Sequence, residues 1–443
     1  MPAVVRAAPR GRLPRVLAVI ATLIARPGLA QVPDTPDPSS LEWVPWGPVL
    51  VAPSLESRWT WTDNLFRVPD EGSVSNGARP QSSGLYELAP VVRFALPYSN
   101  SNFELDYKPL YRDYTATDLP QHYAHDIVGR NQIVLSNGMS IDANFTRSRG
   151  TYELNQFDRA GQVNFATTPF RSTDAEVSWE WTHPSRWGTV LTVEGLWVSF
   201  DNEKAPQPPD DEVELLYDNE SRSATLDVNW FLAPGLAVFG GVAVTRSKVD
   251  AIGEDLDGNG RLDDVEEGFT TGGPLVSETQ RFDQADLRIG LAGPLGPRLE
   301  LRGALARTRL RDLTEEGDAF RGFTTRFESH LRLTRISQLD VTFERQPQQT
   351  LTSRSDTFVY RAERVGWTLT GQRHSFTAGV NSITSRLPDR RENYLIIEGG
   401  WGVKIRRWLG VRAGVSRAVK DSSSDIFDYD ESRADLGVLI GWI

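Results

Sequence analysis

Residues Arg321 to Glu344 read RGFTTRFESHLRLTRISQLDVTFE, and two alternating limbs in this stretch decide the fold. Strand side chains point to opposite faces with period two. In the first limb Phe323, Thr325, Phe327, Ser329, Leu331 and Leu333 share one face, and Thr324, Arg326, Glu328, His330 and Arg332 share the other. After a polar turn near Ile336 to Gln338, Leu339, Val341 and Phe343 alternate with Asp340, Thr342 and Glu344. The stretch predicts a β-hairpin whose two faces meet different solvents.

The length of these limbs separates two classes of β-protein. Strands of soluble proteins average about five or six residues, whereas a strand that crosses about 30 Å of hydrocarbon on a tilt needs about nine to eleven. Both limbs are long enough to span a membrane. After the N-terminal segment the chain has no run of eighteen apolar residues, so we expect no membrane-spanning helix there. The mean hydropathy of -0.38 also argues against a helical membrane protein.

The rest of the chain repeats the alternation of apolar and polar residues. The connections between the expected strands are alternately short and long. Short links such as Asn137-Gly138 and Ala233 to Gly235 are followed by longer polar ones. The longer links are Val68 to Gly84, Gly150 to Arg171, Asp201 to Ser221, Lys248 to Gln280 and Pro347 to Asp356. Short periplasmic turns and long extracellular loops are typical of outer-membrane barrels. We therefore expect residues 49–443 to form an all-β fold, a transmembrane antiparallel β-barrel of about 18 strands.

Two alternatives to this interpretation stay open at this point. The segment Arg159 to Thr168 is assigned to a long loop, although it has the composition of an extra hairpin. Tryptophans near the expected strand ends fit interfacial girdles, and in a soluble β-sandwich they would be core residues. These tryptophans are Trp187, Trp197, Trp367, Trp408 and Trp442. Strand length and loop asymmetry favour the barrel.

The N-terminus predicts export from the cytoplasm. Residues 1–30 combine basic residues, a short apolar run from Val16 to Ile24 and the small residues Gly28 and Ala30, which is the pattern of a secretory signal peptide. A Pro-rich periplasmic lead-in follows at residues 31–48. The chain has no Cys, so disulfides are excluded, and its net charge is -11. We expect a location in the cell outer membrane of a Gram-negative type of bacterium, in contact with outer-membrane lipid, and no nucleic-acid partner.

The first barrel segments resemble a known family. Trp46 to Leu55 contains Gly47, an apolar stretch and Pro53-Ser54-Leu55, and Asp63-Asn64-Leu65-Phe66 follows. These elements are similar to the start of the β-barrel porin 2 family of outer-membrane proteins, and Leu105-Asp106-Tyr107 and Arg112-Asp113-Tyr114 also resemble it. The resemblance implies export of extracellular or capsular polysaccharide, with periplasmic export components as partners.

One acidic segment has the spacing of a calcium-binding loop. Residues 255–266 read DLDGNGRLDDVE, with oxygen ligands at positions one, three and five, Gly260 at six and a glutamate at twelve. The predicted ligands of Ca2+ are Asp255, Asp257, Asn259, the Arg261 carbonyl, Asp263 through water, and Glu266. No amphipathic helices flank the segment, so a solvated acidic loop within residues 248–280 is the alternative.

The histidines do not predict an active site, so we expect no enzyme. His330 and Ser329 fall on opposite faces of one strand and cannot act as base and nucleophile. His122, His125 and Asp126 are more typical of a hydrated rim than of a metal site.

The polar faces carry the functional prediction. Asp174, Glu176 and Glu180 on one strand, Arg302 on another, and Arg326 to Arg332 on a third would line a watery lumen or simply pair across strands. The predicted function is an outer-membrane channel that serves polysaccharide export. The alternatives are a surface barrel for adhesion with calcium-stabilised loops, a general diffusion porin, and a barrel-embedded lipid hydrolase, which lacks the Ser and His that it needs.

Overall fold

A computed structural model describes residues 43–65, 80–115, 121–135, 138–152, 168–201, 218–254, 275–314, 317–349, 357–387, 391–423 and 428–441. The strands are β1 (Val44–Trp46), β2 (Val49–Thr62), β3 (Ser83–Pro97), β4 (Ser101–Tyr114), β5 (His122–Val134), β6 (Met139–Tyr152), β7 (Thr168–His183), β8 (Trp187–Phe200), β9 (Asp218–Ala233), β10 (Leu236–Glu254), β11 (Leu275–Pro294), β12 (Leu299–Asp312), β13 (Gly317–Arg332), β14 (Ser337–Gln349), β15 (Thr357–Thr370), β16 (His374–Arg386), β17 (Arg391–Arg406), β18 (Leu409–Ser422) and β19 (Tyr429–Gly441). The described residues contain no helical segment with the length and hydropathy of a membrane span.

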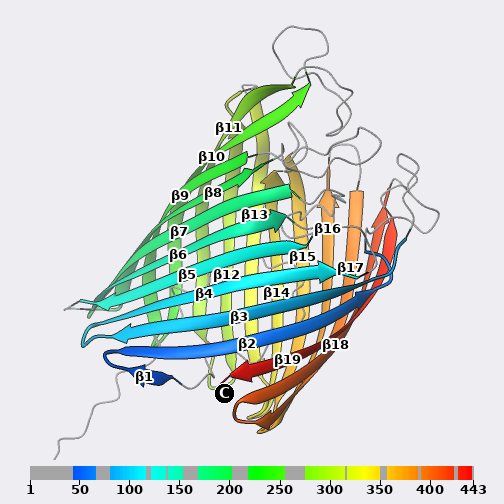
Figure 1. Cartoon of the computed structure of the whole chain (residues 1–443). Helices are drawn as coiled ribbons and strands as arrows, with labels where there is room; N and C mark the ends of the chain where they lie inside the picture. Colours follow the sequence, from blue (N-terminus) through cyan, green and yellow to red (C-terminus); the bar gives the residue numbers. More distant parts are fainter. Residues whose placement is uncertain are drawn as a thin grey trace, which may run out of the picture.

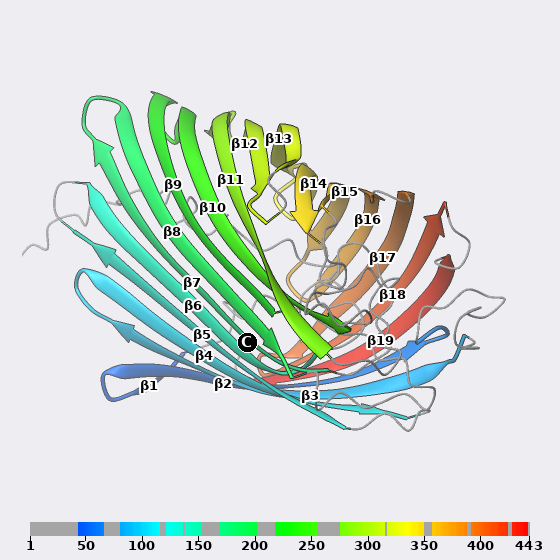
Figure 2. The same cartoon turned by 90° about the horizontal axis from the view of Figure 1, so that it is seen from above.

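The strands form one closed antiparallel barrel (Figures 1 and 2). Each strand from β2 to β18 pairs with the next one along the chain, and β19 closes the ring by pairing with β2 from Arg433 opposite Thr62 to Gly441 opposite Ser54. β1 lies outside this ring and pairs only with β2. Eighteen of the nineteen strands therefore make the barrel, which confirms the predicted fold class and strand number.

The hairpin that decided the fold is present. β13 and β14 pair antiparallel, with Phe327 opposite Phe343 and His330 opposite Asp340. Phe327 is exposed on the apolar face, whereas Glu328 on the other face is 8% exposed. The turn lies slightly earlier than predicted, because the Ser337 carbonyl accepts a hydrogen bond of 2.9 Å from the Leu333 N–H and closes the turn before β14 begins.

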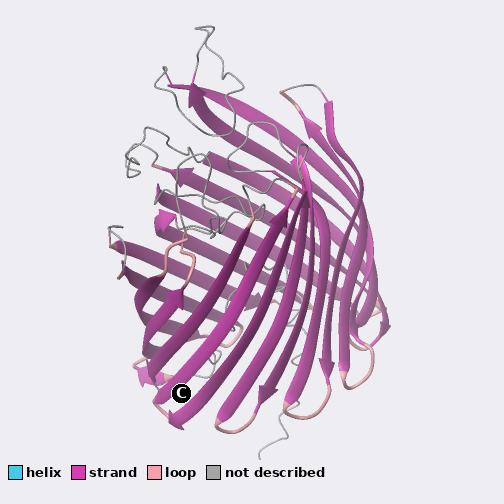
Figure 3. Ribbon diagram, turned by 90° about the vertical axis from the view of Figure 1, so that its right-hand side faces the viewer, coloured by secondary structure: helices cyan, strands magenta, loops and turns pink. Residues whose placement is uncertain are grey.

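Tight turns occupy one end of the barrel, as Figure 3 shows. Only Pro234 and Gly235 separate β9 from β10, and Gly235 has a φ of 81°, which a residue without Cβ adopts at little cost. The last strand ends at this same end, and the turn between β1 and β2 also lies there. Short turns and both chain ends are on the periplasmic side of outer-membrane barrels, so the opposite end faces the outside of the cell.

Several strands extend further toward the outer end than the sequence predicted. The link assigned to Lys248 to Gln280 is ordered strand as far as Glu254 and again from Leu275, with Lys248 opposite Arg281. The Thr279 hydroxyl donates a hydrogen bond of 2.6 Å to the Asp250 carboxylate across this pair. Above the membrane both faces of a strand meet water, so the pairing continues after the apolar alternation has ended.

Part of the predicted lead-in also has defined structure. Residues 31–48 were expected to be free of strands, but Val44–Trp46 form β1, and Trp43 contacts the buried pair Ala52 and Leu439. The Arg93 guanidinium lies 5.1 Å from the centre of the Trp43 ring. The described end of the lead-in is therefore anchored by packing and a cation–π contact that its proline content concealed. The predicted signal peptide at residues 1–30 and the possible hairpin at Arg159 lie outside the described residues.

Candidate functional site: the inner face of the barrel

The inner wall carries an ionic ladder across the seam where the barrel closes. The Arg58 guanidinium of β2 lies 3.8 Å from the Glu87 carboxylate of β3 and 3.6 Å from the Asp435 carboxylate of β19. The Arg112 Nε of β4 donates a hydrogen bond of 2.7 Å to Glu87. The Thr62 hydroxyl donates one of 2.8 Å to Glu431, a residue 369 positions away. These contacts join the first and last barrel strands, so they help to fix the closed register.

A second ionic group lies beside this seam on β3, β4 and β5. The Arg93 Nε donates to the Asp106 carboxylate at 3.1 Å, and Arg130 lies 3.2 Å from the same carboxylate. Glu104 lies 3.8 Å from both guanidinium groups. Two acids and two bases thus alternate across three strands, and their charges cancel.

Oppositely charged side chains on β13 and its neighbouring strands also lie close together. The Arg326 guanidinium lies 2.7 Å from the Glu328 carboxylate, and His330 Nδ1 lies 2.5 Å from the Asp340 carboxylate. Arg302, the predicted lumen residue of β12, lies opposite Glu328 in the register. In this part of the wall, opposite charges therefore lie close together, along β13 for Arg326 and Glu328 and across two strands for His330 and Asp340. Arg332 is likewise on the inward row of β13, at its periplasmic end.

The inner face of β6, β7 and β8 differs, because every charged residue on it is acidic. Asp174, Glu176 and Glu180 of β7 face inward beside Asp142 of β6 and Glu194 of β8, and Glu176 lies directly opposite Glu194. Glu176 and Glu194 accept hydrogen bonds from neutral groups: the Asn144 amide donates to Glu176 at 3.5 Å, and the Ser223 hydroxyl donates to Glu194 at 3.4 Å.

Four of these five carboxylates have no basic side chain beside them among the described residues. Within the described residues, none of Asp142, Glu176, Glu180 and Glu194 has a Lys or Arg within ion-pair distance. Like charges directly opposite each other destabilise a strand pair, so such a sector persists where water or mobile cations solvate it. The acidic sector, defined as these four residues, therefore gives one side of the inner wall a negative potential.

The predicted calcium-binding loop belongs to the part of the chain that the structure does not describe. Asp255, Asp257, Asn259, Arg261, Asp263 and Glu266 all lie outside the described residues. In the part of the chain that is described, no group of three or more His, Asp or Glu side chains could hold a metal ion. Calcium binding stays a prediction.

The histidine cluster predicted at a rim loop is instead part of a strand. His122 and Asp126 face the inside of β5, whereas His125 faces outward and its Nδ1 lies 2.9 Å from the Tyr107 hydroxyl. Residues three apart in a strand lie on opposite faces, so His122 and His125 do not share a site. His330 and Ser329 likewise fall on opposite faces, as expected.

The outer face of the barrel is apolar over its whole circumference. Large side chains that are exposed in every sector include Ile289 at 60%, Val228 at 52%, Val415 at 64% and Leu436 at 54%. A continuous apolar surface of this extent is stable only against lipid, and a closed ring of strands leaves no unpaired edge in the hydrocarbon. The chain is an outer-membrane β-barrel.

The expected aromatic girdle is partly visible at the periplasmic end. Trp187 stacks on His183 with ring centres 5.0 Å apart and meets Trp181 edge-on at 4.9 Å. Trp408 is 45% exposed beside the turn after β17, and the Trp367 indole N–H donates a hydrogen bond of 2.8 Å to the Ser337 hydroxyl. Trp442 lies outside the described residues.

Comparisons with solved structures return other barrels at low sequence identity. The FrpB iron transporter of Neisseria meningitidis (F3-3 variant) aligns with a TM-score of 0.45 and 8% identity over 84% of this chain and 62% of its own. OccK2 (OpdF) of Pseudomonas aeruginosa aligns with a TM-score of 0.44 and 11% identity over 89% of this chain and 98% of its own. The ferric-catecholate import receptor Fiu of E. coli K12 aligns with a TM-score of 0.43 and 10% identity over 88% of this chain and 81% of its own. No protein-family model and no curated protein matches the sequence.

Proposed function

We propose that the barrel is a water-filled channel for hydrophilic solutes with a preference for cations. The observation that supports this proposal most is the acidic sector, in which Glu176 and Glu194 oppose each other without a basic partner among the described residues. Elsewhere on the wall, acids such as Glu87 and Asp435 lie beside bases such as Arg58 and Arg112. A sector of the wall with an excess of negative charge concentrates cations along that sector.

Within this proposal, we assign export of extracellular or capsular polysaccharide as the specific role. The support is the resemblance of Gly47, Pro53 to Leu55 and Asp63 to Phe66 to the β-barrel porin 2 family, which itself stays a prediction. The paired arginines and carboxylates of the inner wall offer both donors and acceptors to sugar hydroxyls. Periplasmic export components would then bind at the short-turn end.

A deletion strain tests the exporter role. Loss of surface polysaccharide, restored by the wild-type gene, would support export. Normal surface polysaccharide together with slower uptake of small sugars would instead favour a general diffusion porin. Liposome swelling with neutral sugars of increasing size measures that second activity directly on the purified protein.

The rival proposal is a barrel whose calcium-binding loop serves adhesion. It rests on the spacing of Asp255 to Glu266 and requires no transport. Calcium-dependent binding to surfaces by cells that carry the protein, combined with the absence of any channel activity, would favour it. We expect no catalytic activity, because Ser329 and His330, which are adjacent in the sequence, lie on opposite faces of β13 and cannot act as nucleophile and base.

A further inference from the structure

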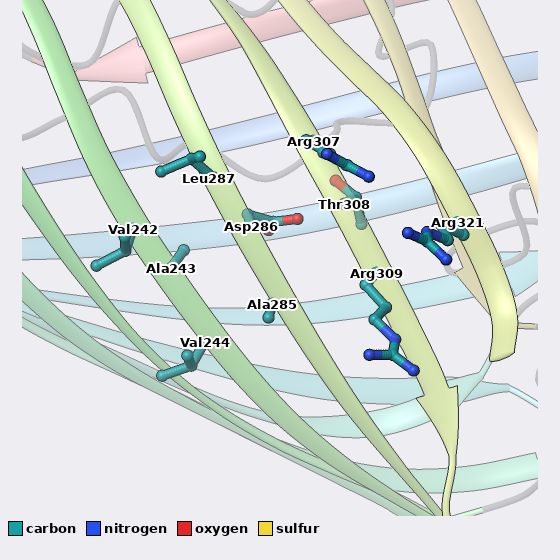
Figure 4. A pocket seen from close by; sticks show the side chains of 10 residues that line it. All are labelled: Val242, Ala243, Val244, Ala285, Asp286, Leu287, Arg307, Thr308, Arg309 and Arg321. Carbon is teal, nitrogen blue, oxygen red and sulfur yellow. The ribbon is translucent and has the colours of Figure 1, made fainter. Parts of the chain in front are cut away.

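A groove of about 430 Å³ lies across four neighbouring strands of the barrel wall, β10 to β13 (Figure 4). Its outward-facing lining falls into two rows of register partners. The first row runs Val242, Leu287 and Arg307, and the second runs Val244, Ala285, Arg309 and Arg321. One half of the groove is therefore apolar and the other half carries three arginines.

The height of the groove on the wall follows from the strand geometry. On β12 the outward residues Leu299, Leu301 and Leu305 are apolar, and Arg307, Arg309 and Arg311 follow toward the outer end. Arg307 is eight residues from the start of the strand, which is about 26 Å along the strand and about 20 Å along the membrane normal at a tilt of about 40°. The apolar band of such barrels is about 25 Å tall, so Arg307 lies about 5 Å below its outer border and Arg309, two residues further along, lies at that border.

Two arginines of the groove, Arg307 and Arg321, differ from another outward arginine nearby. At about the same height, Arg246 of β10 donates to the Asp283 carboxylate at 2.8 Å, and its charge is neutralised within the wall. Within the described residues, Arg307 and Arg321 have no carboxylate within ion-pair distance, and both are exposed. Arg309 and Arg321 lie directly opposite each other, so an anion bound by Arg321 would also lie close to Arg309.

We propose that this groove binds a phosphorylated lipid of the outer leaflet. The lipid's acyl chains would lie on Val242, Val244 and Leu287, which continue the apolar outer face, and its phosphate would accept hydrogen bonds from the arginines at the border. Arginine suits this role because its planar group donates two parallel hydrogen bonds to a phosphate. The proposal is independent of what the channel transports.

The test is native mass spectrometry of the refolded full-length protein in detergent, titrated with bisphosphorylated lipid A. The groove variant carries Arg307→Gln, Arg309→Gln and Arg321→Gln. The control variant carries Arg147→Gln, Arg149→Gln and Arg171→Gln, three exposed outward arginines on β6 and β7 that do not line the groove. The control is closely matched, because Arg147 and Arg149 are also eight and ten residues from the start of their strand, and Arg149 lies opposite Arg171.

We expect the groove variant to bind the lipid at least about tenfold more weakly than the wild type, and the control variant to stay within about twofold. Lipid A without phosphate should bind the wild type as weakly as phosphorylated lipid binds the groove variant. Equal losses in both variants, or equal binding of the two lipids, would overturn the proposal. Displacement of the lipid by about 10 mM inorganic phosphate would show a free-anion site instead. Each variant is first checked for heat-modifiable migration on gels, and the single substitution Arg321→Gln replaces the triple one if that variant does not fold.

Discussion

An arginine introduced into β9 should destabilise the folded barrel strongly at an outward-facing position and only slightly at the inward-facing position next to it. Val228 faces outward and is 52% exposed, whereas its neighbour Asn229 faces inward. Val228 is five residues from the periplasmic end of β9 at Ala233, which corresponds to about 17 Å along the strand and about 13 Å along the normal. This height is close to the middle of an apolar band about 25 Å tall.

Val228→Arg should therefore lower the free energy of unfolding by about 2 to 4 kcal/mol, the cost of Arg at the bilayer midplane. Asn229→Arg should change it by less than about 1 kcal/mol, because the new guanidinium reaches the water of the lumen. The assay is urea-dependent folding into lipid vesicles, followed by the difference in gel migration between folded and unfolded protein. Equal losses in the two variants, or a larger loss for Asn229→Arg, would refute the assignment of inner and outer faces.

Three further predictions address the inner wall and the loop. Glu176→Gln combined with Glu194→Gln should shift the reversal potential in a salt gradient toward that of a non-selective pore, and unchanged selectivity would show that the acidic sector does not face the permeation path. Arg58→Met should cost about 1 to 2 kcal/mol in the same vesicle assay, because the two carboxylates that it bridges stay on the wall without it. Titration calorimetry of the full-length protein with millimolar calcium should give a binding heat that Asp255→Ala and Glu266→Ala abolish, and equal heats would reduce the motif to a solvated acidic loop.

The sequence predicts the barrel well because a membrane-spanning strand leaves a local signal. The alternation of Phe323, Phe327 and Leu331 with Arg326 and His330 is visible within a few residues, and the solvent on each side enforces it. The sequence assigned the outer ends of β10 and β11 to a loop for the same reason. Above the membrane both faces of a strand meet water, so nothing maintains the alternation of apolar and polar residues there.

The sequence alone could not predict which side chains of the inner wall pair with each other, because the pairs depend on the register between strands. Thr62 and Glu431 are 369 residues apart and meet only after the ring has closed. By contrast, the acidity of β7 was visible in the sequence, although the absence of a nearby base was not. The separation of His122 from His125 could have been found by applying the period of two to this segment, which had been assigned to a rim.

Conductance of the purified, heat-modifiable protein in a planar lipid bilayer tests the central claim most directly. The account predicts discrete, ohmic current steps and a reversal potential of the sign expected for a cation-preferring pore in a potassium chloride gradient. Folded protein that inserts into the bilayer without producing any current steps, or that produces an anion-selective current, would contradict it.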